Sequence, residues 1–488
     1  MKKIMRYSYI SMLLTTGMLL QRCDDFLERD PLSRQTNDDL GNTPGSTGFT
    51  TADQAEAVLA GCYGDFRNEY FQLDYYVNGD AQSDNAYAGA DNPNNFQIDE
   101  YAIESVNNNV LRDWRYLYGT IAKTNTVLDH IDEVTDAALM EARRAEIKGE
   151  AAFIRGFMYF ELVRQFGDVP LLIHEITEWD VDDLDKIYVA RAPQADVYQQ
   201  IIQDLELAVA NARAASVNRN IVTKSTAHFL LAKVYATIEP HDWNKVHEHA
   251  DAVLAAGFEL LPEFDQLWDG THENSSEAIF EITYDGWDAG TGNWGAGMFY
   301  GIDWKKFNTP TNDLVAAFDA EGDEIRRDAS IRFADVTGKW SDRYWPLTNF
   351  PYAYKYRNTS GTQNYILFRL ADIMLLKAEA LTHDGQLEAA ADLVNEIRAR
   401  VDLDPITPTT EADMLLAIEK ERRLELVFEG QRWYDLKRTG RALEVMNAFR
   451  DGNGNSLGYT LTEDRLFWPI PQNERDKNEK LTQNNGYF

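Results

Sequence analysis

The residues best suited to hold a ligand lie between 285 and 304, where aromatic rings alternate with carboxylates, amides and glycines. The rings are Trp287, Trp294, Phe299, Tyr300 and Trp304, and the polar side chains are Asp285, Asp288, Asn293 and Asp303. A sugar presents apolar C–H faces ringed by hydroxyl groups, so a carbohydrate site needs exposed aromatic planes beside hydrogen-bonding side chains. The many glycines and the lack of an amphipathic period predict that about half of these rings are displayed, while the others fill a small core under the loop.

A second stretch of similar character runs from about Gly79 to Asn95, directly after Tyr75 and Tyr76. Together the two stretches supply eight candidate glycan contacts, which are Trp287, Trp294, Tyr300, Trp304, Tyr76, Asp84, Asn85 and Tyr87. Trp287 and Trp294 are the expected stacking platforms. Asp84 and Asn85 are the expected hydrogen-bond partners of sugar hydroxyls. A third aromatic stretch, 340–356, ends in an alternation that favours a hairpin or core role.

The sequence contains only weak matches to patterns for catalysis, metal binding or cofactor binding. Gly290-x-Gly292-x-x-Gly295 has the spacing of a dinucleotide-binding loop, but such a loop needs a helix directly after it and the sequence there predicts none. His247 and His249 lie two apart on a predicted helix and so point to different faces, which disfavours a metal pair. The chain has 80 acidic residues, so a glycosidase pair can be neither chosen nor excluded from sequence. We predict no metal, no cofactor and no catalytic residue.

Charge and composition exclude some classes of partner. A formal net charge of −33 opposes binding to nucleic acid, which depends on Lys and Arg replacing counterions on the phosphates. The same charge disfavours polyanionic ligands unless a local basic pocket compensates. A hydrophobic content of 44% can fill a sizeable core, and the two cysteines, Cys23 and Cys62, offer little scope for disulfides. Cys62 is predicted to be buried on a helix that begins after Thr51.

Helical periodicity dominates the rest of the chain and predicts a mainly α fold. Expected helices include 141–166, 195–214, 225–237, 243–255, 366–382, 387–401 and 411–428. They come in pairs typical of tetratricopeptide-like repeats, about four in number, with Gly156 and Ala232 allowing close approach. The expected divisions are 51–256 as an N-terminal helical part, 257–364 as an irregular ligand-binding insertion with a few short strands, and 365–488 as a C-terminal helical part.

Several segments together resemble the SusD/RagB family. They are 150–171, from Glu150-Ala151-Ala152-Phe153 to Val169-Pro170-Leu171, then Thr223-Lys224 with the helix after it, 369–380, 421–436, and the terminal Asn484-Asn485-Gly486-Tyr487. The resemblance implies a four-repeat scaffold with an irregular ligand-binding face, to which the stretches 285–304 and 79–95 contribute. It also implies a partner, a SusC-like TonB-dependent outer-membrane transporter. The charged residues of 421–432 have helical spacings that suit ion pairs within the scaffold rather than catalysis.

The N-terminus predicts export and lipid anchoring. Lys2, Lys3 and Arg6 precede an apolar run that is too short to span a bilayer, as in a signal peptide over 1–22. Leu20-Gln21-Arg22-Cys23 resembles a lipobox with Cys23 as the lipidated residue, although Gln21 and Arg22 depart from the usual small residues. Residues 23–50 read as a tether, and Asp24 and Asp25 resemble a surface-export signal of Bacteroidetes lipoproteins.

The sequence therefore predicts a non-enzymatic, surface-exposed outer-membrane lipoprotein that captures oligosaccharide or polysaccharide for the transporter. Two alternatives remain open at this point: a lid that captures peptides or other nutrients without glycan affinity, and a glycoside hydrolase.

Overall fold

Helix ends in the computed structural model follow capping groups that are visible in the sequence. The structure describes residues 49–89, 91–176, 184–299 and 305–487. Thr51 accepts a hydrogen bond from the backbone N–H of Gln54 at 3.3 Å and so begins the first described helix. Gly167, with φ of 73°, ends the helix Glu141–Phe166 as expected. The predicted signal peptide, Cys23 and nearly all of the tether lie outside the described residues.

The long helices are α3 (Ala52–Gly64), α6 (Asn108–His130), α7 (Glu141–Phe166), α9 (Gln194–Asn211), α10 (Lys224–Tyr235), α11 (Trp243–Leu254), α15 (Leu370–His383), α16 (Leu387–Ala399) and α17 (Glu411–Glu425). Shorter helices are α4 (Tyr75–Asp80), α5 (Pro93–Asp99), α8 (Leu184–Ile187), α12 (Gly295–Phe299), α13 (Asn312–Glu321), α14 (Glu324–Ser330), α18 (Arg432–Arg438), α19 (Ala442–Ala448) and α20 (Gln472–Lys477). A π-helical turn, η2 (Tyr70–Asp74), precedes α4.

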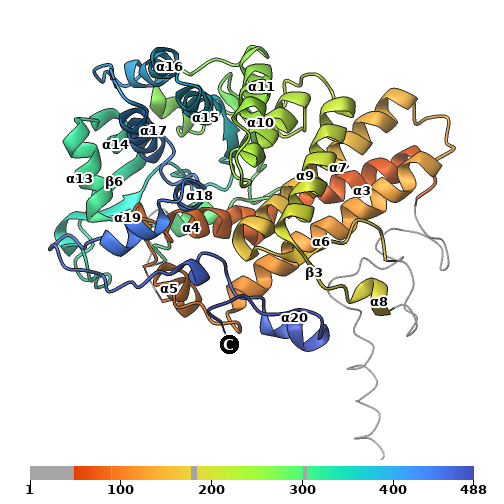
Figure 1. Cartoon of the computed structure of the whole chain (residues 1–488), viewed down its shortest axis with the longest axis horizontal. Helices are drawn as coiled ribbons and strands as arrows, with labels where there is room; N and C mark the ends of the chain where they lie inside the picture. The colour runs from red at the N-terminus through yellow and green to blue at the C-terminus, as the bar shows by residue number, and fades with distance from the viewer. Residues whose placement is uncertain (1–48, 90, 177–183, 300–304, 488) are drawn as a thin grey trace, which may run out of the picture. The chain divides into compact units, whose positions relative to one another are not determined.

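Neighbouring helices pack in pairs, in the manner of tetratricopeptide repeats. The pairs in contact include α6 with α7, α9 with α10, α11 with α15, and α16 with α17, and Figure 1 shows α3, α6, α7 and α9 lying alongside one another. Gly149 on α7 permits a close approach to the end of α9, because a Cβ there would lie 2.6 Å from the backbone nitrogen of Ala212. At Gly156 the same test gives an ordinary contact of 3.4 Å with α9. The predicted mainly α, tetratricopeptide-like fold is confirmed.

Strands pair segments that are distant in sequence. The paired strands are β1 (Ala86–Tyr87) with β5 (Thr309–Pro310), β2 (Val169–Pro170) with β3 (Arg191–Ala192), β4 (Ala278–Ile282) with β8 (Tyr365–Arg369), and β6 (Ile331–Ala334) with β7 (Phe350–Ala353), all antiparallel. The helix expected over 366–382 therefore begins only at Leu370. Its first residues instead form β8, because they complete a ladder with β4.

The segment 257–364 is more regular than the sequence indicated. It contains α13 and α14 as well as strands, and the five-residue α12 follows Trp294 where no helix was expected. Its strand β4 belongs to a sheet with β8, which lies outside the segment. Residues Gly48 to Phe488 accordingly form one compact unit. Within the described ranges, no helix is both long and apolar enough to cross a bilayer.

The charged residues of 421–432 lie in the core as ion pairs, as predicted. Arg422 is bound to Asp372 at 2.8 Å, and Glu421 and Glu425 accept from Arg326 at 2.6 and 3.0 Å. All five side chains are almost fully buried. Cys62 is also fully buried, as expected from its helical position.

Candidate functional site: an exposed tryptophan seated on glycines

Two loops meet to form the surface around Trp287. The first follows β4 and folds back on itself, because the backbone N–H of Thr291 donates to the carbonyl of Gly286 at 3.3 Å. The second loop, 357–364, precedes β8. Asn293 joins them, since its backbone N–H donates to the carbonyl of Gly361 at 2.9 Å and its Nδ2 donates to the carbonyl of Gln363 at 2.9 Å. Pairing of β4 with β8 brings the two loops together.

Trp287 lies on a seat made by two glycines. A Cβ added to Gly292 would lie 2.3 Å from the indole, and one added to Gly361 would lie 2.7 Å from it, so side chains are excluded at both positions. Gly361 also has φ of 85°, which favours glycine. The Trp287 side chain is nevertheless 55% exposed, while Gly361 is buried. The ring is therefore supported from within and presents its remaining surface to solvent.

Polar side chains lie on the same two loops as this ring. The Thr291 hydroxyl donates to the Asp285 carboxylate at 3.2 Å, and the hydroxyls of Ser360 and Thr362 lie 2.9 Å apart. Asn358 donates to the Thr362 hydroxyl at 3.3 Å. Asp285, Ser360 and Thr362 are exposed. An aromatic plane beside hydroxyl, amide and carboxylate groups can stack on the C–H face of a sugar and hydrogen-bond to its hydroxyls.

The end of the first loop is anchored to the π-helical turn η2. The backbone N–H of Trp294 donates to the side-chain oxygen of Gln72 at 3.0 Å. A Cβ at Gly295 would lie only 1.9 Å from the Gln72 carbonyl oxygen, so the two segments touch through backbone. Trp294 itself is half-buried, so its ring is less available than that of Trp287. Tyr300 and Trp304 lie outside the described residues.

Tyr76 and Tyr87 do not reach this surface. The Tyr76 ring is fully buried, with its centroid 4.9 Å from that of Tyr365 and 5.1 Å from that of Tyr356. Tyr87 is 7% exposed and its hydroxyl donates to Asp342 at 2.8 Å. Both residues differ from the expectation that they contact glycan. The Tyr76 ring packs in the core, and Tyr87 is buried with its hydroxyl bound to Asp342.

Asp84 and Asn85 also differ from the expectation that they meet sugar hydroxyls. Asp84 is buried and accepts from Arg432 through both oxygens at 2.7 and 2.9 Å. The nearby guanidinium groups of Arg423 and Arg432 outweigh burial and lower the pKa of Asp84 to about 2. Asn85 is fully buried, donating to Asp80 at 3.1 Å and accepting from Arg423 at 3.1 Å. These side chains connect the 79–87 segment to the scaffold.

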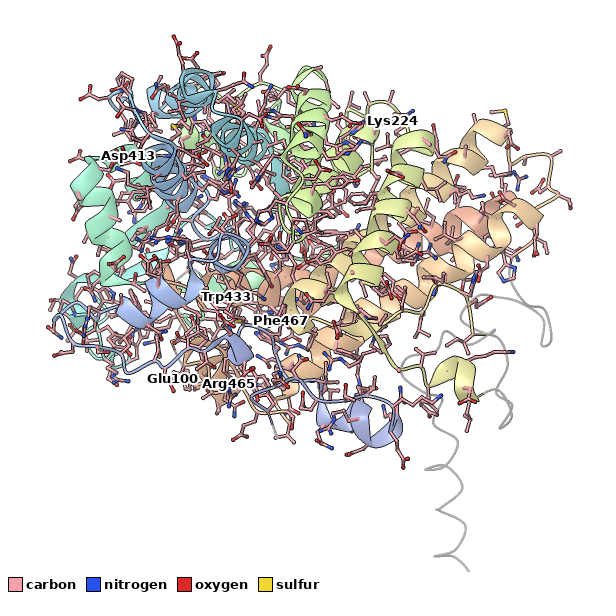
Figure 2. The ribbon with its side chains drawn as sticks, viewed as in Figure 1. Glu100, Lys224, Asp413, Trp433, Arg465 and Phe467 are labelled. Carbon is pink, nitrogen blue, oxygen red and sulfur yellow. The ribbon has the colours of Figure 1, made fainter. Side chains whose placement is uncertain are left out.

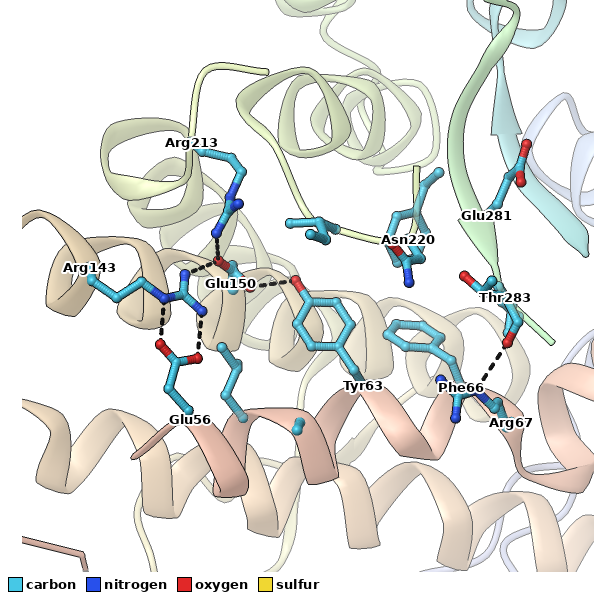
Figure 3. A pocket seen from close by; sticks show the side chains of 15 residues that line it. Glu56, Tyr63, Phe66, Arg67, Arg143, Glu150, Arg213, Asn220, Glu281 and Thr283 are labelled. Carbon is cyan, nitrogen blue, oxygen red and sulfur yellow. Dashed lines mark hydrogen bonds and ion pairs between the residues drawn. The ribbon is translucent and has the colours of Figure 1, made fainter. Parts of the chain in front are cut away.

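A separate pocket of about 290 Å³ lies between α3, α7 and β4 (Figure 3). Arg143 donates to both oxygens of Glu56 at 2.7 and 2.8 Å and to Glu150 at 2.7 Å. Figure 3 shows Tyr63 pointing to Glu150, where its hydroxyl donates at 2.7 Å, and Arg213 approaching the same carboxylate at 3.3 Å. The charges of Glu56, Arg143, Glu150 and Arg213 are thus paired within the wall. Sequence reasoning missed this pocket because its residues come from several distant segments.

The acidic residues near these sites are held by local partners. Glu281 in the wall of the Figure 3 pocket is buried, which raises its pKa to about 7. It accepts hydrogen bonds from the Asn274 backbone at 3.0 Å and from the Asn364 side chain at 3.0 Å. In the parts of the chain that the structure describes, no three His, Cys, Asp or Glu side chains gather as metal ligands.

Two family models match most of the chain. Residues 25–236 match a family described as starch-binding and associating with the outer membrane, and residues 298–487 match the SusD family. A curated relative, SusD-like protein P2 of Formosa agariphila, is 29% identical over the full length of both chains.

Solved structures share the fold. A laminarin-binding SusD-like protein is 25% identical, with a TM-score of 0.71 over 90% of this chain and all of the other. A SusD superfamily protein from Bacteroides vulgatus is 22% identical, with a TM-score of 0.76 over 89% of this chain and 99% of the other.

Proposed function

The chain belongs to the SusD family, and we propose from this premise that it binds glycan at the outer cell surface. The observation that carries the proposal is the exposed Trp287 ring, which rests on Gly292 and Gly361. A large aromatic side chain that stays exposed on a tailored seat loses little conformational entropy when a ligand stacks on it. This arrangement suits a sugar face rather than a core contact.

The relatives support a carbohydrate ligand. One solved relative is described as laminarin-binding, and one matching family model is described as starch-binding. Both laminarin and starch are neutral polysaccharides, which agrees with a chain whose net charge is −33. We therefore place neutral glucans first among the ligands of the Trp287 surface.

Capture rather than turnover fits the residues near Trp287. A glycosidase needs two accessible carboxyl groups that face the scissile bond. Asp285 and Asp288 are both exposed, and Asp285 accepts the Thr291 hydroxyl. A general acid also needs a raised pKa, and Glu281, whose pKa burial raises to about 7, is shielded behind hydrogen-bond partners. The finer part of the proposal is delivery: the protein is anchored through Cys23 and passes its glycan to a SusC-like TonB-dependent transporter.

The first experiment compares Trp287→Ala with the wild type in calorimetric titrations against laminarin, starch fragments and other neutral oligosaccharides. Loss of the stacking surface should weaken binding by about tenfold or more. Tyr116→Ala is the matched control, because Tyr116 is an exposed ring on α6 and should be neutral.

Three outcomes would count against the proposal. Equal glycan affinity in Trp287→Ala and wild type would remove Trp287 from the site. Affinity for peptides with none for any glycan would favour a different cargo. New reducing ends in the titrated glycan would indicate hydrolysis. Delivery is tested separately by co-purifying the protein with SusC-like transporters from its native outer membrane, and failure to associate would reject that part.

A further inference from the structure

A larger pocket, of about 690 Å³, lies between α9 and α18. It has no residue in common with the Trp287 loops or with the Figure 3 pocket. Its wall combines the rings of Tyr198 and Phe467, the amides of Gln199 and Gln203, and the ammonium group of Lys437. The wall also includes the carboxylate of Glu239, which is 75% exposed and lies 3.3 Å from His241. Figure 2 labels Phe467 and Trp433, and the Nζ of Lys437 lies 4.3 Å and 5.9 Å from the centres of these two rings. Its volume falls within the usual range of small-molecule sites.

Lys437 is a basic side chain whose ammonium form the protein does not neutralise locally. Its Nζ donates to the backbone carbonyl of Arg164 at 2.6 Å and lies 4.3 Å from the centre of the Phe467 ring. Within the described ranges it contacts no carboxylate. An ammonium group has three N–H donors, so the single bond to Arg164 leaves donors for a ligand.

The other cations of the wall are already paired. The guanidinium of Arg164 binds Glu161. Arg438 binds Glu379 at 2.7 Å and Asp435 at 2.8 Å. Lys437 is therefore the cation of this pocket that is left to meet an incoming anion.

Burial and the neighbouring Arg164 lower the pKa of Lys437 to about 7. The ammonium form thus lacks a counter-charge in its present surroundings. An oxyanion in the pocket would stabilise that form by a charge-assisted hydrogen bond, which is among the stronger interactions available to a protein. The lowered pKa agrees with the geometry, in which Lys437 has a carbonyl but no carboxylate partner among the described residues.

We propose that the pocket between α9 and α18 is a subsite for a sugar that carries an oxyanion, with that oxyanion held by Lys437. The aromatic rings suit the C–H face of the sugar, and the glutamine amides suit its hydroxyls. Since the long-range field of the chain repels anions, a local cation is what an acidic sugar requires. The choice of a sugar rests on the proposed function, whereas the choice of an anion rests on Lys437.

The test uses titration of the full chain with matched small probes. Methyl glucuronide carries a carboxylate, glucose 6-sulfate carries a sulfate ester, and methyl glucoside is the neutral counterpart. Of the two charged sugars, we expect the one that binds more tightly to exceed methyl glucoside in affinity by about tenfold or more. Lys437→Met should abolish this preference and Lys437→Arg should retain part of it. The two charged probes distinguish carboxylate from sulfate.

A second variant guards against misfolding. Ala195 is an exposed residue of α9 at the pocket wall, so Ala195→Trp obstructs the pocket without removing a polar group. It should lose the charged sugar while melting like the wild type. The proposal is overturned if the wild type shows no preference, if Lys437→Met keeps it, or if an acidic peptide binds as tightly as either sugar.

The two proposals fail separately. Trp287→Ala should leave the preference for the charged sugar unchanged while it weakens binding of neutral glucan. If Trp287→Ala has no effect on neutral glucan but Lys437→Met abolishes the preference for charge, the Trp287 site is wrong and the Lys437 subsite stands.

Discussion

At the scale of single residues, the role of an aromatic side chain is decided by what lies beneath it. Trp287 and Tyr76 both come from polar, glycine-containing stretches, yet Trp287 is 55% exposed and Tyr76 is fully buried. Trp287 rests on two glycines that leave room for the ring and nothing more. Tyr76 instead inserts among Tyr356, Tyr365 and Phe299. Only the first arrangement holds a ring ready for a ligand.

Gly292→Ala tests the seat without removing the ring. The new methyl group would lie 2.3 Å from the indole, so Trp287 must tilt or shift. We expect glycan affinity to fall by about two- to tenfold, as for a misplaced stacking surface. Gly297→Ala on α12 is the control, because a Cβ there meets no atom within 4 Å. Unchanged affinity in Gly292→Ala would mean that the ring position does not matter for binding.

At the scale of elements, the π-helical turn η2 links the ligand loop to the scaffold through Gln72 and Trp294.

A second local junction joins α10 to α11, where the Nδ1 atoms of His228 and His249 lie 3.0 Å apart. One ring must donate and the other accept, so the pair cannot tolerate a proton on both facing nitrogens. Tyr235 stacks on His249, with ring centroids 5.6 Å apart. The junction is therefore compatible with neutral imidazoles.

This pair predicts that stability falls at acid pH. Burial, then the His228 charge, lowers the pKa of His249 to about 4, and burial also lowers the pKa of His228. The unfolded chain binds more protons over this range than the folded chain does. The contribution of the pair to stability is therefore fully present above about pH 6.5 and is lost as pH drops towards 4. The charged groups that face the pair are Glu248, Lys245 and Lys224.

Chemical denaturation between pH 7 and pH 4 measures the effect. His249→Phe should make the loss of stability with falling pH shallower than in the wild type. His174→Gln is the matched control, because His174 is 78% exposed and paired with Asp129 at the surface. Parallel pH profiles for His249→Phe and the wild type would contradict the prediction.

At the scale of the whole described unit, buried charges join segments that are far apart in sequence. Arg369, at the end of β8, is 1% exposed and binds Glu277 at 3.0 Å, Glu425 at 2.7 Å and Glu429 at 2.7 Å. Glu277 directly precedes β4, whereas Glu425 ends α17. The cluster therefore ties the 257–364 segment to the C-terminal helices.

Arg369→Met should destabilise the protein strongly, because it removes the cation that three buried carboxylates share and leaves them only Arg400, Arg326 and Lys355 as partners. We expect a loss of about 3–5 kcal/mol in the free energy of unfolding. Arg327→Met removes an arginine whose partner Asp319 is 55% exposed, and it should cost about 0–1 kcal/mol. Urea unfolding of both variants gives the comparison. A loss for Arg369→Met no larger than for Arg327→Met would show that the cluster contributes little.

Much of the helical scaffold is determined by the sequence alone. Helix α7 spans the expected residues, and the Thr51 cap lies where its hydrogen-bonding pattern predicts. These features depend on groups within one or two helical turns, so a single sequence contains the information. The apolar run from Tyr365 onward was different. It was expected to be helical from Ile366, and its first residues became β8 only because the distant β4 supplied a partner.

The candidate site shows the same division between features that the sequence indicates and features that depend on distant contacts. Sequence alone identified the aromatic, glycine-rich stretch around Trp287, because exposed stacking surfaces have that composition. Tertiary structure decided that Asp84 faces Arg432 instead of solvent, that Gly361 supports Trp287, and that Lys437 lines a pocket with Tyr198. Each of these outcomes depends on a contact between segments far apart in the chain. Composition tells which side chains can bind a ligand, but only long-range contacts decide which of them remain exposed and unpaired.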